Sequence, residues 1–223
     1  MRNTIPVITI DGPAASGKGS IAQKVATTLS FHYLDSGKIY RALAVAANKR
    51  QISAPDTAKL IALTQELTTD PQQLHLLQRD PTIVSPPVGQ QASQIAKNPA
   101  LRQLLIPLQR GLRQMPGLVA DGRDMGSVIF PDATVKVFLT ADLAIRAERR
   151  LKQLQNNGIY AKITDVCEDL AQRDQTDRGR AVSPLTPPAG ALHIDSTQQS
   201  ITDIVKNVIR AYHNAVFIPP SAN

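Results

Sequence analysis

The chain has 223 residues, 42% hydrophobic and 4% aromatic, with one cysteine, Cys167, and a formal net charge of +7. It is long enough for one sizeable core, contains no stretch that approaches the ~20 apolar residues of a membrane span, and cannot form an intrachain disulfide. Because its N-terminal apolar run is interrupted at Asp11, unlike that of a signal peptide, we expect a cytoplasmic globular protein without a membrane partner.

The first predicted elements are a strand over residues 7–10 and a helix over residues 21–29, joined by a glycine-rich turn. Glycines in such a turn let successive backbone N–H groups point into one concavity. The N-terminus of the following helix and Lys18 add positive charge there. The Gly-x4-Gly-Lys spacing between a strand and a helix therefore predicts a loop that binds phosphate. Its residues are Gly12, Pro13, Ala14, Ala15, Ser16, Gly17, Lys18, Gly19 and Ser20.

The loop departs from the strict motif in one place. Ser or Thr normally follows the lysine and holds Mg²⁺, but here Gly19 intervenes before Ser20. This variant resembles the loop of nucleoside monophosphate kinases, in which the nucleotide enters with its Mg²⁺ and the hydroxyl acts through water. We therefore predict no direct protein ligand for the metal.

The next predicted elements lead away from the loop and back. Residues 31–35 are predicted to form a strand that ends at Ser36, followed by a helix with Arg41 near its start, which makes an edge suited to an anion. Ser53-Ala54-Pro55 predicts a capped helix as far as about Leu67.

The segment from Thr68 to Gly89 is interrupted by four prolines, and we predict a small irregular β insert there. Helices are expected over residues 88–97 and 98–115. The second should be kinked at Pro107, because a proline inside a helix costs about 3 kcal/mol.

The second half of the chain repeats the alternation of strand and helix. Alternation with helices of 10 to 15 residues predicts a parallel sheet covered by helices on both faces, with ligands beyond the carboxyl ends of the strands. Gly12, Asp35 and Asp124 all fall at such ends. Strands are predicted over residues 118–121, 135–139 and 192–195, and helices from Asp142 to about Asn157, from Thr164, and over residues 200–214.

The helix that starts at Thr164 carries a basic stripe. Arg173, Asp177 and Arg180 are spaced i, i+4 and i+7, with Asp174 and Arg178 beside them. In isolation this pattern fits equally well a solvated face with ion pairs worth a few tenths of a kcal/mol. In a chain with a phosphate loop, it indicates a lid that places positive charge on a transferring phosphoryl group.

Four segments together resemble the bacterial cytidylate kinases, which are P-loop NTPases of the nucleoside monophosphate kinase family, over nearly the full length. They are Asp11-Gly12-Pro13 through Gly17-Lys18-Gly19-Ser20, Leu34-Asp35-Ser36-Gly37 with Tyr40-Arg41, Gly122-Arg123-Asp124-Met125-Gly126, and Arg173-Asp174 through Asp177-Arg178 and Arg180. The resemblance implies a three-layer α/β/α fold with a mostly parallel central sheet. It implies one domain over residues 1–223, with a monophosphate-binding insert at about 62–115 and a helical lid at about 155–181.

The implied reaction is transfer of the γ-phosphoryl group of ATP to CMP or dCMP. Lys18, Arg123, Arg173, Arg178 and Arg180 are the expected catalytic residues. By resemblance, the cytosine would contact Ser93, Arg102 and Asp124, the sugar hydroxyl Asp177, and the monophosphate Arg41, Arg123 and Arg180 with Ser36 nearby. The sequence departs from the family in its insert, which is short and has Ile83-Val84-Ser85 where Ile-Arg-Thr is usual.

Other functions remain open from the residues, and the first alternative is a P-loop kinase of another nucleoside monophosphate or of a small metabolite's hydroxyl group. A nucleotide monophosphate needs no general base, because its second pKa is near 6, whereas a kinase of a small metabolite's hydroxyl group could use Asp35 as base. A nucleotide switch or RNA-binding module is the third reading. Asn48-Lys49 is not followed by the residues of a GTP-binding motif, however, and with no tryptophan and few aromatics a stacking platform is not expected. We expect a monomer that binds ATP and CMP and no nucleic acid.

Overall fold

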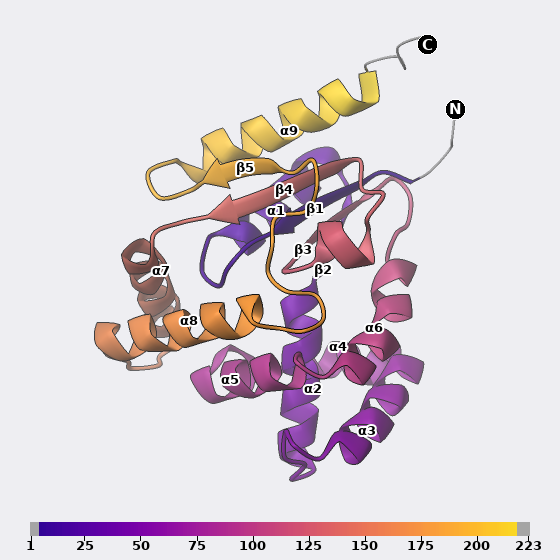
Figure 1. Ribbon diagram of the computed structural model, residues 1–223, viewed down its shortest axis with the longest axis vertical. Coiled ribbons are helices and arrows are strands. Elements are labelled where there is room, and N and C mark those ends of the chain that lie inside the picture. The colour runs from indigo at the N-terminus through magenta and orange to yellow at the C-terminus, as the bar shows by residue number, and fades with distance from the viewer. Residues whose placement is uncertain (1–4, 218–223) are drawn as a thin grey trace.

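The computed structural model describes residues 5–217. Its centre is a parallel sheet in the order β2-β3-β1-β4-β5 (Figure 1). The predicted parallel sheet is confirmed, and every predicted strand occurs within about one residue of its expected limits. The strands are β1 (Val7–Asp11), β2 (His32–Asp35), β3 (Leu118–Gly122), β4 (Val135–Thr140) and β5 (Leu192–Asp195).

Helices cover both faces of the sheet, so the fold has three layers. On one face, α1 (Lys18–Leu29) and α9 (Ile201–Phe217) pack against residues such as Ile8, Ile10 and Val137. On the other face, Val7 and Leu118 pack with side chains from α2 (Ser36–Lys49), α6 (Pro99–Gly111) and the short π-helical turn η2 (Met125–Ile129). The alternation of side chains along each strand supplies both faces with apolar surface.

The insert between α2 and β3 is helical, and the prediction of a β insert is wrong. It contains α3 (Thr57–Thr69), α4 (Pro71–Leu77), a 3-10 turn η1 (Pro81–Val84), α5 (Pro86–Ile95) and α6. Pro107 lies inside α6, but the four prolines within residues 68–89 interrupt no helix, because each lies in a first turn, where the missing N–H has no partner to lose. Asp70 and Asp80, which precede two of them, accept hydrogen bonds from Gln73 N and Thr82 N as caps.

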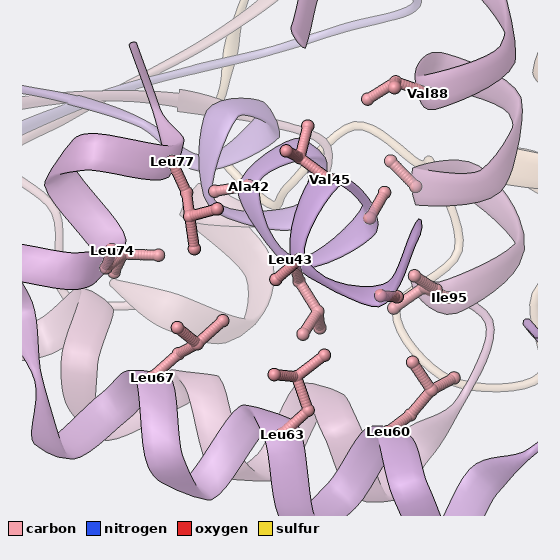
Figure 2. Close-up of a cluster of buried hydrophobic side chains, with 14 of the residues drawn as sticks. Ala42, Leu43, Val45, Leu60, Leu63, Leu67, Leu74, Leu77, Val88 and Ile95 are labelled. Atoms are coloured by element: carbon pink, nitrogen blue, oxygen red, sulfur yellow. The ribbon is translucent and has the colours of Figure 1, made fainter. Parts of the chain in front are cut away.

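The core of the insert forms around α2, which passes through its centre (Figure 1). Leu43 of α2 faces Leu60 and Leu63 of α3, Val45 lies on the opposite side of α2, and side chains from α4 and α5 complete the cluster (Figure 2). Burial of each such side chain is worth about 1.5–3 kcal/mol, so the insert has a substantial hydrophobic core of its own, and α2 connects it to the sheet.

Three details of helix boundaries differ from expectation. The N-cap of α3 is Asp56, whose carboxylate accepts from Lys59 N at 3.3 Å, and not Ser53. Asp142 does occupy the N-cap of α7 (Leu143–Asn156), but its side chain makes no capping hydrogen bond. The helix of the expected lid, α8 (Ile163–Arg178), ends before Arg180, so the basic stripe continues into the loop.

Helices α7 and α8 pack on each other beside the phosphate loop (Figure 1). Their shared cluster includes Leu154, Val166 and Leu170 and reaches Ala14 of the loop. The expected outer limits of the domain, residues 1 and 223, lie outside the described part. Within residues 5–217, no helix combines the length and apolar character needed to cross a bilayer.

Candidate active site

A cavity of about 740 Å³ lies at the carboxyl ends of the strands. The phosphate loop and α1 form one side of it, α2 and the insert helix α5 another, and α7 and α8 a third. This is the edge at which parallel sheets bind ligands, so the fold places every predicted motif around one space.

The phosphate loop has the backbone geometry that its glycines allow. A Cβ at Gly12 would lie 2.1 Å from the carbonyl oxygen of Leu139 in β4, so only glycine permits this close approach. Gly17 has a φ of +93° at the N-cap of α1, a left-handed conformation that favours glycine. Ala14 to Ser20 line the cavity, whereas Gly12 and Pro13 are buried and do not.

Lys18 lies in a cluster of charged groups on the cavity wall. Its Nζ donates to Pro13 O at 3.1 Å, and the nearby carboxylates are those of Asp121 and Asp35. Burial and then Arg123 lower the pKa of Lys18, and burial and then Asp35 raise the pKa of Asp121. The phenol of Tyr33 donates to Asp121 Oδ1 at 3.3 Å. Anionic phosphates beside Lys18 would favour its charged form.

Arginine side chains form a second cationic region across the cavity. Arg123 Nε donates to Asp177 Oδ2 at 2.7 Å, and Arg180 pairs with the other oxygen of the same carboxylate. Arg41 donates to Ile83 O at 2.7 Å, and burial, with Arg173 nearby, lowers the pKa of Arg41 to about 9. All four arginines line the cavity.

The three residues expected to contact the cytosine lie together. Arg102 and Asp124 form a buried ion pair, and Arg102 also donates to Ala96 O at 3.3 Å. The guanidinium lies 5.6 Å from the centre of the Tyr40 ring, a cation–π contact. Arg102 Nε and Ser93 Oγ are buried and have no hydrogen-bond partner among the described residues, which leaves polar groups available to a ligand.

Two of the predicted site residues, Arg178 and Ser36, differ from the others in their surroundings. Arg178 is exposed and is not among the residues that line the cavity. Ser36 is buried and lines it, and a Cβ at Gly122 would meet its hydroxyl at 2.6 Å. The roles expected for both stay predictions.

Sequence reasoning missed several cationic and polar groups on the wall. Arg149 and Arg150 line the cavity from α7, and Arg150 donates to Val84 O of the insert at 2.9 Å. Tyr33 and Asp121 line it from β2 and β3. The signal for Asp121 was its position at the carboxyl end of a strand beside β1. For arginines on a basic helix, the sequence does not show whether the side chains line a cavity or face solvent.

Together, a phosphate loop at the end of β1, a facing set of arginines and one cavity between them define a P-loop nucleotide kinase. The family model described as cytidylate kinase matches residues 8–214 of this chain, and the chain therefore belongs to the cytidylate kinase family.

Individual relatives agree over nearly the whole chain. A cytidylate kinase of Polynucleobacter asymbioticus is 46% identical over 218 residues, which are 96% of this chain and 99% of that protein. A cytidylate kinase of Bordetella pertussis is 49% identical over 208 residues, which are 92% of this chain and 93% of the relative. Among solved structures, an uncharacterized protein from Eubacterium ventriosum aligns with a TM-score of 0.51 at 10% identity, over 93% of this chain and 98% of that one. That likeness concerns the fold alone.

Proposed function

We propose that the protein transfers the γ-phosphoryl group of ATP to CMP or dCMP, giving ADP and CDP or dCDP. The observation that carries the proposal is that Ser93, Arg102 and Asp124 share one cavity with the phosphate loop. Membership of the family supports the same reaction, since the curated relatives are cytidylate kinases.

A protein accelerates phosphoryl transfer mainly by positioning the two substrates and by placing positive charge around the transferring group. An oxygen of the acceptor's monophosphate attacks the γ-phosphorus in line, and the bond to the bridging oxygen of ADP breaks. Lys18 and the arginines at 123, 173 and 180 stabilise the charge that spreads over the transferring group. No general base is needed, because the attacking oxygen is already ionised at neutral pH.

Base recognition follows from complementary donors and acceptors. The exocyclic amine of cytosine can donate to the carboxylate of Asp124, while its N3 and O2 can accept from Arg102 and Ser93. Asp177 would accept from a sugar hydroxyl, and Arg41, Arg123 and Arg180 would hold the monophosphate, with Ser36 nearby.

The donor set of the cavity fits Mg²⁺ that arrives with ATP. Residues 5–217 contain no group of three or more His, Cys, Asp or Glu side chains suited to a metal, but Asp121, Asp35 and Ser20 line the cavity. Mg²⁺ usually keeps several waters beside its phosphate oxygens, and these three side chains could accept hydrogen bonds from those waters without being direct ligands. When bound, the ion would neutralise charge on the β- and γ-phosphates.

We further propose one domain, with residues 62–115 as the monophosphate-binding insert and residues 155–181 as the lid. Arg178 would reach the transferring group only after the lid closes. A single free cysteine supports a reducing, cytoplasmic setting, and we expect a monomer.

A panel of acceptors tests the proposal. Specificity constants for CMP, dCMP, UMP, AMP and GMP are measured with ATP, next to ATP turnover alone and with small polyols. CMP and dCMP should lead the panel, and turnover without an acceptor should be negligible. Equal turnover with a polyol, sensitive to Asp35→Asn, would favour the kinase of a metabolite's hydroxyl instead. Salt-sensitive binding of polynucleotide without turnover would favour an RNA-binding module.

A further inference from the structure

One guanidinium, that of Arg146 on α7, joins three separate parts of the fold. Its Nε donates to Ala141 O at 2.9 Å, just beyond the end of β4, and one NH group donates to Ala14 O of the phosphate loop at 3.3 Å. The other NH group pairs with Asp174 Oδ2 of α8 at 2.7 Å. Both side chains are buried, and neither lines the cavity.

The pair is tightly interdependent. Asp174 Oδ1 is buried without a hydrogen-bond partner among the described residues, and the carboxylate's one ion pair is with Arg146. A buried charge that loses its partner is strongly unfavourable. A movement of α8 that carries Asp174 must therefore carry the Arg146 side chain or break the pair.

Arg149, one turn further along α7, holds the same loop from the same side. It donates to Ser16 O at 3.3 Å and to Ser196 Oγ and O at 3.0 and 2.7 Å, and Ser196 Oγ also donates to Ser16 O at 2.8 Å. The carbonyls of Ala14 and Ser16 are thus both turned toward α7.

The direction of these carbonyls determines what the loop offers the nucleotide. In a trans peptide, the N–H of the next residue points opposite to the carbonyl. With Ala14 O and Ser16 O held on the side of α7, the N–H groups of Ala15 and Gly17 point away from α7, and both residues line the cavity. Backbone N–H groups aimed in this way are what a phosphate-binding loop needs.

We propose that Arg146 and Asp174 are positioning residues that couple the placement of the lid helix α8 to the orientation of the phosphate-loop amides. ATP affinity then depends on a buried ion pair that contacts neither nucleotide. This inference deepens the proposed function and rests on ATP being the phosphate donor.

The primary variant is Arg146→Lys. It keeps every charge and can still pair with Asp174, but one ammonium group cannot reproduce the planar fork that reaches Ala141, Ala14 and Asp174 together. Asp174→Asn is less selective, since Asp174 also acts electrostatically on Arg123 and Arg173. The matched control is Arg113→Lys, because Arg113 likewise donates to a backbone carbonyl, Ile5 O, and pairs with a carboxylate, Asp132, but does not touch the loop.

The test measures ATP affinity by calorimetry without CMP, and KM and kcat for both substrates. Loss of one charge-assisted hydrogen bond to the loop should weaken ATP binding and raise the KM for ATP roughly tenfold. The KM for CMP and kcat should change less than about twofold, since the loop contacts ATP alike in the ground and transition states. Arg113→Lys should change none of these.

The outcomes are separable. If wild-type enzyme turns over CMP and ATP but Arg146→Lys leaves the KM for ATP unchanged, the coupling is wrong and the pair only stabilises the fold. A lower melting temperature with a reduced kcat and unchanged KM values has the same meaning. If Arg146→Lys does not fold, Asp174→Asn takes its place with the same readout. In the Arg146→Lys background, Asp174→Asn should add little to the KM for ATP, and full additivity would contradict the link. Absence of any turnover by the wild type would count against the proposed function instead.

Discussion

The pKa of Lys18 depends on opposing effects of its surroundings. Burial and Arg123 lower its pKa, while Asp121 and Asp35 oppose them. A bound triphosphate would add negative charge and favour the ammonium form, so the residue is best charged when its substrate is present. The same ammonium can follow the transferring phosphoryl group, whereas the loop amides cannot.

Replacing Lys18 should therefore abolish turnover without unfolding the protein. Lys18→Ala should lower kcat more than a hundredfold, which corresponds to a lost transition-state contact of ~3 kcal/mol. Steady-state kinetics measure the effect, with Lys24→Ala on the exposed side of the same helix as control. A Lys18→Ala enzyme that retains more than about a tenth of wild-type turnover would show that the loop amides and arginines suffice.

Asp124 should determine the choice of pyrimidine. UMP would place its O4 against the carboxylate, and an unmade buried hydrogen bond costs ~1–3 kcal/mol and more when one group is charged, so CMP should be preferred by roughly 10- to 1000-fold. In Asp124→Asn the amide can donate to O4, and the ratio of specificity constants for CMP and UMP should fall, mainly because CMP becomes worse. The ratio is informative even though the variant also leaves Arg102 without its ion-pair partner, because that cost applies to both nucleotides. An equal loss for both would make Asp124 purely structural.

The residues of the site differ in how well a sequence predicts them. The loop from Gly12 to Ser20 is a contiguous motif whose glycines have a local physical reason. Ser93, Arg102 and Asp124 are brought together only by the tertiary fold, so family resemblance was needed to group them. Arg149 and Arg150 went unnoticed because the direction in which a helix faces depends on packing that no local pattern contains.

Among the secondary-structure elements, the helices of the insert were predicted wrongly because of their prolines. Four prolines within residues 68–89 suggested a broken β structure, yet the pattern Asp-Pro at 70–71 and 80–81 is a cap followed by a first helical position. Short apolar pieces such as Leu74-His75-Leu76-Leu77 do not distinguish a one-turn helix from a strand. The strands of the sheet were less ambiguous, because they alternate with helices along the chain.

Two glycines should respond in opposite ways to the addition of a methyl group. Gly12→Ala would push a Cβ against Leu139 O of β4, and the backbone cannot yield cheaply, so the variant should lose about 1–3 kcal/mol of stability together with its activity. Gly111→Ala at the end of α6 meets nothing within 4 Å and should gain roughly 0.5–1 kcal/mol. Urea unfolding measures both. A neutral Gly12→Ala would mean that the loop can move away from the sheet.

The proposed lid, residues 155–181, should become protected when both substrates bind. Helix α8 already contacts the insert through a hydrogen bond from Gln90 Nε2 to Asp169 Oδ1 at 3.0 Å. Closure of the lid over the γ-phosphate would therefore shorten an existing distance between α8 and the insert. Hydrogen exchange should slow across the segment with ATP and CMP, while α3, which lines no part of the cavity, should be unchanged. Equal exchange rates with and without ATP and CMP would contradict the proposal that this segment closes as a lid.

At the scale of the whole molecule, the topology explains why one cavity can serve two nucleotides. The order β2-β3-β1-β4-β5 places the phosphate loop after the central strand. The insert emerges from the β2 and β3 side of the sheet, and the α7–α8 pair follows β4. Helix α2 connects the insert core to the sheet, and Arg146 connects α8 to the loop. The alternation of strands and helices predicted the sheet, but it did not predict these contacts of the insert with the sheet and of α8 with the phosphate loop.

Phosphorylation of CMP by ATP is tested by following the phosphoryl group itself. ATP labelled with radioactive phosphorus at the γ position is incubated with CMP and the enzyme, and the products are separated by chromatography. The label should appear in CDP, in amounts equal to the ADP formed, and Lys18→Ala should yield almost none. Label released as inorganic phosphate, or transferred to other monophosphates as readily as to CMP, would contradict it.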